Sequence, residues 1–257
     1  MQYLIGIWVF IIGACIGSFL NVVIIRGLKN EQIISGRSHC TTCDYELKWY
    51  DNIPIISYIM LGGKCRKCKE HISLQYPLVE AGNAACWLIL YLKYGFSVAT
   101  VLYMISVSSM FVISIVDLKI KEIPSTHNLI ILICGVLLVV TKSIQVKEAI
   151  LGALVVSLFL LAVYLFCLIV LSLEAIGEGD IKLEFAIGLC LGLKLTVTGF
   201  YIGCILAIII HSLLRLLKIK GFESNMLPFG PYLCLGAFIA LIYGNQIADK
   251  VLLFLGF

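Results

Sequence analysis

Charge is scarce in this sequence. Only 13% of its 257 residues are Asp, Glu, Lys or Arg, whereas 61% are apolar. A soluble globular domain usually has about 25% charged residues, so this composition excludes that class. The chain also lacks a nucleotide-binding fingerprint such as GxGxxG, and it has no basic stripe interleaved with aromatic residues. Nucleic acid is therefore not an expected partner.

Long apolar runs dominate the chain instead. A hydrocarbon core of about 30 Å needs about 20 apolar residues in a helix. The runs cover residues 3–25, 77–92, 95–116, 128–141, 149–173, 181–193, 195–214 and 231–248. We therefore predict an all-α, polytopic membrane protein with about eight transmembrane helices in the lipid bilayer. One alternative is a single long helix over residues 184–214, with Lys194 reaching the membrane surface.

The cationic residues favour one side of this bundle. If eight helices alternate across the membrane, fourteen of the nineteen Lys and Arg residues fall at or near loops on the same side. Loops rich in Lys and Arg favour the cytoplasm. This predicts that the polar insert at residues 26–76 is cytoplasmic and that both chain ends lie outside. The net charge of +4 then reflects membrane topology.

Four of the eleven cysteines form paired motifs in the polar insert. Cys40 and Cys43 make one CxxC motif and Cys65 and Cys68 a second, with 21 residues between them. Two such pairs can supply four thiolates to one tetrahedral zinc ion, which would help a segment with little core of its own to fold. Disulfides are the weaker alternative in a reducing compartment. Two histidines flank the motifs and are either further ligands or solvated, His39 and His71.

Two aspartates lie at ends of predicted helices, where a charge is costly. Asp117 closes the third apolar run, and Asp180 opens the sixth in the stretch GEGDIKL. The chain crosses twice between them, so both carboxylates return to one membrane face. Gly177 and Gly179 on either side of Glu178 permit another segment to approach closely. Two carboxyl groups that share a proton can hydrolyse a peptide bond, whereas the alternative is a pair of solvated helix-end carboxylates.

The order of these motifs resembles the type IV prepilin peptidases, membrane aspartyl proteases with a GxGD motif. The resemblance is carried by GSFLNVVIIR, the segment from SHCTTC to YPLVE, the Asp117 segment ending in IP, GEGDIKL and LPFGPYL, in this order along nearly the whole chain. Preflagellin peptidases share the GxGD motif but usually lack the cysteine insert. The charged Glu178 inside GxGD departs from the family, and as a third acid it would raise the proton affinity of the pair. Lys182 adds a nearby positive charge.

The resemblance implies an endopeptidase that cuts the basic leader from type IV prepilins and pseudopilins, after a glycine, at the cytoplasmic face of the bacterial inner membrane. Asp117 and Asp180 would be catalytic, with Gly177 and Gly179 shaping the site. It also implies N-methylation of the new amino terminus with S-adenosylmethionine, for which no binding residue is identified. Glu80, in YPLVE, would either position a substrate amine or basic leader or simply mark a helix start.

Three domains follow from this interpretation. They are a first transmembrane helix (1–25), a zinc-binding cytoplasmic insert and methyltransferase region (26–76), and a transmembrane peptidase domain (77–257). Such an enzyme would serve type IV pilus assembly or protein secretion. Two other classes remain open, a proton- or ion-coupled transporter or redox protein with a structural zinc insert, and a non-enzymatic scaffold of a secretion complex.

Overall fold

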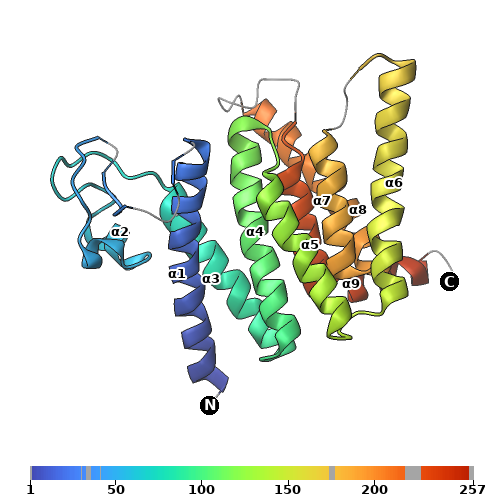
Figure 1. Cartoon of the computed structure of the whole chain (residues 1–257), viewed down its shortest axis with the longest axis horizontal. Coiled ribbons are helices and arrows are strands. Elements are labelled where there is room, and N and C mark those ends of the chain that lie inside the picture. Colours follow the sequence, from blue (N-terminus) through green and yellow to red (C-terminus); the bar gives the residue numbers. More distant parts are fainter. Residues whose placement is uncertain are drawn as a thin grey trace. The chain divides into compact units, whose positions relative to one another are not determined.

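The computed structural model describes residues 2–29, 31–32, 36–40, 42–173, 177–217 and 227–254, with side chains up to residue 250. The chain divides into two compact units, Met1–Phe96 and Ser97–Phe257. All regular elements of the described residues are helices, which confirms the predicted all-α class (Figure 1). The only strand-like pairs there are isolated bridges in the insert.

Two long helices, α1 (Gln2–Leu28) and α3 (Gln75–Tyr94), pair side by side in the first unit (Figure 1). Glycines let their backbones touch, because a Cβ added at Gly17 would lie 2.7 Å from the Cα of Glu80. Small residues at such crossings are typical of helices that associate in membranes. A buried amide adds to the contact, since Asn83 Nδ2 donates to the Gly13 carbonyl at 2.8 Å.

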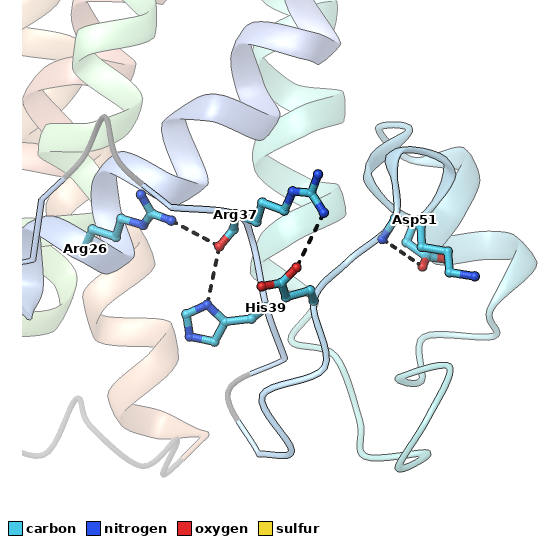
Figure 2. Close-up of polar contacts among 6 residues, drawn as sticks. Arg26, Arg37, His39 and Asp51 are labelled. Atoms are coloured by element: carbon cyan, nitrogen blue, oxygen red, sulfur yellow. Dashed lines mark hydrogen bonds and ion pairs between the residues drawn. The ribbon is translucent and has the colours of Figure 1, made fainter.

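The polar insert connects these two helices and contains a 3₁₀ helix, η1 (Trp49–Asn52), and a short helix, α2 (Ile56–Met60). Arg26 orders the start of the insert. Its guanidinium donates to the carbonyls of Gln32 and Gly36, each at 3.1 Å. Figure 2 shows Arg26 and His39 converging on the carbonyl of Arg37, each at 3.4 Å. One side chain at the end of α1 therefore binds three carbonyls of the loop.

The second unit is a bundle of six helices among the described residues. They are α4 (Val98–Ile120), α5 (Ser125–Val140), α6 (Val146–Val170), α7 (Glu178–Leu191), α8 (Leu193–Leu216) and α9 (Gly230–Phe254). Within this unit α7 packs against α5 and α6, and α4 packs against α5 and α9. Helices α6 and α7 cross at a glycine contact, where a Cβ on Gly152 would lie 2.6 Å from the Gly188 carbonyl oxygen.

Each predicted apolar run forms a helix, and within the described part of the chain five helices are long and apolar enough to cross a membrane. These are α1, α4, α6, α8 and the Gly230–Lys250 part of α9, while α5 is a shorter apolar helix. The alternative of one long helix through residue 194 is wrong, because Gly192 has a left-handed φ of 76° and separates α7 from α8. Helix α3 groups with α1 in the first unit. The assignment of activities to residue ranges stays a prediction.

Candidate functional sites

Two turns with matching backbones bring the four thiols together in the insert. In each, the N–H of the first cysteine donates to a carbonyl five residues later, Cys40 to Tyr45 at 3.0 Å and Cys65 to Glu70 at 2.8 Å. The residue after each second cysteine is left-handed, and these residues are Asp44 (φ 52°) and Lys69 (φ 62°). Isolated bridges close the turns, His39 with Glu46 and Lys64 with His71. Each turn thus reverses the chain and presents two thiols on one side.

The four sulfur atoms of Cys40, Cys43, Cys65 and Cys68 all lie within 4.8 Å of one another. Sγ of Cys40 is 3.8 Å from that of Cys68, and Sγ of Cys43 is 3.9 Å from that of Cys65, too far apart for the roughly 2.05 Å of a disulfide. Backbone hydrogen bonds from Cys68 and Lys67 lower the pKa of Cys65 to about 6, whereas burial and hydrogen bonds from the neighbouring thiols raise the pKa of Cys68 to about 12. Cys65 is therefore the thiol that most readily gives the thiolate a metal requires. The four thiols converge as predicted. That they bind a metal stays a prediction.

An ion pair between the exposed Arg66 and the buried Asp51 attaches the second turn to the rest of the insert. Arg66, between the two cysteines of its motif, contacts Asp51 Oδ1 at 2.8 Å through Nη2 and at 2.9 Å through Nε. The Lys48 N–H donates to the other Asp51 oxygen at 3.3 Å, as Figure 2 shows. The hydrogen bond from Arg66 to Asp51 raises the pKa of Arg66. Asp51 therefore has partners on both oxygens, as a buried carboxylate needs.

The second candidate site is a pair of buried aspartates in the helix bundle. Asp117 lies in the last turn of α4 and Asp180 in the first turn of α7, and their carboxylates interact electrostatically. The Gly230 N–H, which begins α9, donates to Asp117 Oδ2 at 2.9 Å. Asp180 Oδ2 lies 3.2 Å from where a Cβ on Gly177 would be. The stretch LPFGPYL thus contributes a donor to one acid, and the GxGD motif leaves room for the other.

Gly179 has a different neighbour. A Cβ at this position would lie 3.0 Å from the Cβ of Ile123, in the loop between α4 and α5. The missing side chain therefore lets that loop approach the start of α7. Each glycine of the motif therefore leaves space for a different neighbour, Asp180 at Gly177 and Ile123 at Gly179. Their part in any reaction stays a prediction.

A third carboxyl group adjoins the aspartate pair, and sequence reasoning missed it. Glu184 in α7 is only 2% exposed, and its Oε2 has no hydrogen-bond partner among the described residues. It interacts electrostatically with Asp180, one helical turn earlier. Cys204 of α8 and Cys234 of α9 also lie within its electrostatic reach. The i, i+4 spacing in DIKLE is the signal that places both acids on one helix face.

Glu178 and Lys182 lie differently from what we expected. Glu178 was expected to be the third acid near the pair, but its side chain is exposed and contacts Lys182 Nζ at 3.4 Å. This is an i, i+4 pair on the outer side of α7, and such pairs contribute little to stability. The acid that interacts with Asp180 from within α7 is Glu184. The Lys182 ammonium forms its ion pair with Glu178.

Glu80 connects the insert to the helix pair of the first unit. Its Oε2 accepts a hydrogen bond from the Ile55 N–H at 2.7 Å, and the Ser18 side chain also hydrogen-bonds this carboxylate. Ile55 has a positive φ of 63°, which this bond helps to hold. Glu80 is buried, so it supports the fold of the insert at this point. A further role toward a substrate stays a prediction.

The fold and the second site define a polytopic membrane protein in which two buried aspartates from separate helices interact electrostatically. Family models agree with this class. The type IV leader peptidase family matches residues 104–212, and the bacterial peptidase A24 N-terminal domain matches residues 11–94. The chain belongs to the type IV leader peptidase family.

Relatives named prepilin leader peptidase/N-methyltransferase are similar over nearly the whole chain. The protein of Pseudomonas aeruginosa is 30% identical over 96% of this chain and 93% of its own length. That of Pseudomonas putida is 28% identical over the same shares. The protein of Xanthomonas campestris is 29% identical over 95% of this chain and 93% of its own. No solved structure matches the chain.

Proposed function

We propose that this protein is a membrane aspartyl endopeptidase that removes the basic leader of type IV prepilins and pseudopilins and then N-methylates the new amino terminus. The observation that carries the proposal is the electrostatic interaction between the buried carboxylates of Asp117 and Asp180, with a backbone donor bonded to Asp117. Family membership and the names of the relatives support both activities.

The aspartate pair supplies both an acid and a base. The ionised carboxylate takes a proton from a water molecule, whose oxygen bonds to the carbonyl carbon of the scissile peptide. The protonated carboxyl group hydrogen-bonds the carbonyl oxygen while negative charge develops there. The C–N bond then breaks, and a proton passes to the leaving amine. Because the Gly230 N–H occupies Asp117 Oδ2, the Oδ1 atom is the one left to face water or substrate.

Glu184 belongs to the same acidic cluster in this proposal. Its burial beside Asp180 and its unpartnered oxygen support a role in positioning the pair or in holding the proton that the pair shares. A carboxyl group without a partner costs stability, which favours a functional reason for its presence. Gly177 and Gly179 shape the site, while Glu178 and Lys182 lie at its outer side.

We assign zinc to the four thiols of the insert. Tetrahedral zinc with Zn–S bonds of about 2.3 Å separates its sulfur ligands by about 3.8 Å. The sulfur separations of 3.8 Å and 3.9 Å support this choice. When bound, zinc would hold the two turns together. Cys40, Cys43, Cys65 and Cys68 would be its ligands, and the ion would stabilise the folded insert.

The remaining assignments follow from the charge pattern and the family. Residues 26–76 would carry the methyltransferase region and residues 77–257 the peptidase, after a first transmembrane helix at 1–25. Lys and Arg distribution supports placing the insert and both aspartates at the cytoplasmic face of the bacterial inner membrane. S-adenosylmethionine would supply a methyl group to the new terminal amine, which loses a proton in exchange. Glu80 would position this amine or the basic leader.

One experiment tests both activities. Purified protein in detergent is incubated with a prepilin that carries its leader, with and without S-adenosylmethionine, and the mature amino terminus is analysed by mass spectrometry. We expect cleavage after a glycine in both samples and a mass increase of one methyl group only with S-adenosylmethionine. Intact prepilin in both samples would overturn the peptidase assignment. Cleaved but unmethylated pilin in both would overturn the methyltransferase assignment alone.

A further inference from the structure

A group of large apolar side chains is exposed on the otherwise polar insert. Ile59 and Met60 of α2 are 70% and 80% exposed, and Trp49 of η1 is 79% exposed. Ile56, which begins α2, is also exposed. Because η1 and α2 contact each other, these four residues belong to one part of the insert, which we call the apolar tip. Exposing such a group of apolar side chains to water is unfavourable, and groups of this kind usually mark an interaction site.

The start of α2 is held well inside the length of α1. The Ile55 N–H donates to Glu80, and Glu80 lies against α1 at Gly17 and Ser18. Arg26 is the first charged residue of α1, and Ser18 lies eight residues before it, about 12 Å along a helix. Since α1 is apolar and long enough to cross a membrane, its charged end marks the surface. The chain therefore enters α2 below that surface.

Charged and aromatic side chains accompany the apolar tip. The Lys48 ammonium lies 5.7 Å from the centre of the Tyr50 ring, and the Trp49 and Tyr50 rings stand edge to face at 5.6 Å. Tryptophan, tyrosine and lysine together are typical of the headgroup region, where their apolar bodies and polar ends are both satisfied. Near the point where Glu80 binds Ile55, α1 and α3 also expose the large apolar residues Phe19 and Leu78.

We propose that the apolar tip is an interfacial anchor, which inserts into the headgroup and upper acyl region of the same bilayer leaflet that the insert end of α1 meets. Interfacial helices sink about 5–10 Å into this region, which agrees with a helix that starts below the charged end of α1. The partner is lipid, and the inference is independent of the catalytic assignment. Its consequence is that the four-thiol cluster is held at the membrane surface.

Tryptophan fluorescence tests the anchor directly. The chain has three tryptophans, and Trp8→Phe with Trp87→Phe leaves Trp49 as the only reporter. The full chain is reconstituted into vesicles of phosphatidylcholine and phosphatidylglycerol, with either nitroxide-labelled lipid or aqueous acrylamide as quencher. We expect blue-shifted emission and about twofold stronger quenching by a shallow nitroxide than by acrylamide. The proposal would be overturned if Trp49 emission is red-shifted and is quenched by acrylamide but not by the nitroxide.

A second reporter places α2 itself. Met60→Trp, combined with Trp8→Phe, Trp49→Phe and Trp87→Phe, puts the probe on the short helix and should give the same ranking of quenchers. The double substitution Ile59→Ser with Met60→Ser should return Trp49 to water, whereas Lys67→Ser, in the second thiol turn, should not. Metal content of each variant checks that the insert remains folded. A folded double variant that leaves Trp49 quenching unchanged contradicts the proposal.

Two other occupants of the tip would give different results. If the tip binds a prepilin, protection from acrylamide appears only after the substrate is added. If it binds a second copy of the chain, protection rises with the ratio of protein to lipid. Either result, in place of protection by lipid alone at low protein density, overturns the lipid assignment.

Discussion

The two candidate sites are built in opposite ways. The thiols of the insert are brought together by two short turns, each of which sets its own geometry within eight residues and has its backbone groups bonded locally. The carboxylates of the bundle come from α4 and α7, and their positions depend on how these helices pack against α5 and α9. One site is local and largely satisfied, whereas the other depends on long-range packing and holds a carboxyl oxygen with no partner among the described residues.

The two constructions suit the sites to different roles. A cluster of thiols with matched turns stabilises a small segment when it binds a metal, so its contribution is to folding. Buried acids contribute nothing comparable to stability, because each must be removed from water. Proteins retain such groups where chemistry needs them. Substitutions should therefore affect the two sites separately.

The largest effect is expected for the aspartates. Asp117→Asn or Asp180→Asn keeps the size of the side chain but removes the acid or base, so cleavage of a prepilin should fall by roughly 100- to 10,000-fold. Initial rates from gel or mass analysis measure this. Metal content should match that of the unaltered protein, because the thiols belong to the unit Met1–Phe96 and the aspartates to the unit Ser97–Phe257. Cleavage within tenfold of normal in either variant would contradict the assignment.

Removal of thiols should produce the converse result. Cys40→Ser together with Cys65→Ser should abolish metal binding, measured by elemental analysis as the loss of about one zinc per chain. Methylation should be lost with it, while cleavage should change much less than in the aspartate variants. Cys15→Ser is a matched control, because Cys15 is an exposed cysteine of α1 outside the cluster. A purified wild-type protein that holds no metal would defeat the four-thiolate site.

Substitution of Glu184 should have a smaller effect, and it should raise stability while lowering the cleavage rate. Glu184→Leu removes a buried carboxyl group whose Oε2 has no partner among the described residues, so the free energy of unfolding should rise by about 1–3 kcal/mol. Cleavage should fall nonetheless, because the group adjoins Asp180. Thermal melting in detergent and the prepilin assay provide the two readings, with Glu184→Gln as the variant of similar size and polarity. Increased stability with full activity would assign Glu184 no part in the reaction.

The smallest effect is expected on the outer side of α7. Glu178→Gln breaks only the exposed pair with Lys182, so stability should change by less than about 0.5 kcal/mol. Cleavage and its pH profile should stay the same, because no contact joins Glu178 to the aspartates among the described residues. The pH profile of the purified variant is the measurement. A displaced profile would show that Glu178 couples to the pair after all.

Local features could be predicted from the sequence, since they depend on few neighbours. The apolar runs predicted the helices because length and composition decide them, and the CxxC spacing predicted the convergence of the thiols. Glycines beside Asp180 indicated a close approach, and the structure supplies the neighbours, Ile123 at Gly179 and the Asp180 carboxylate itself at Gly177. The matching backbones of the two thiol turns are less visible, because their sequences share little beyond the cysteines.

Features that depend on which helix face is buried could not be predicted. Glu178 and Glu184 are both acids close to Asp180 in sequence, and only the packing of α7 against its neighbours decides that Glu184 faces inward. The break at Gly192 has the same origin, since the chain must turn there to let α8 pack against α9. The ion pair of Arg66 with Asp51 joins residues of the insert that no periodic pattern relates.

That ion pair has a consequence for engineering of the insert. The two thiol turns share a backbone pattern, so either sequence could in principle form either half of the metal cage. Only the second carries an arginine between its cysteines, and that arginine docks onto Asp51. Exchange of the two sequences would preserve the ligands but leave the cage untethered from η1. The halves are therefore alike as metal binders and not interchangeable as building blocks.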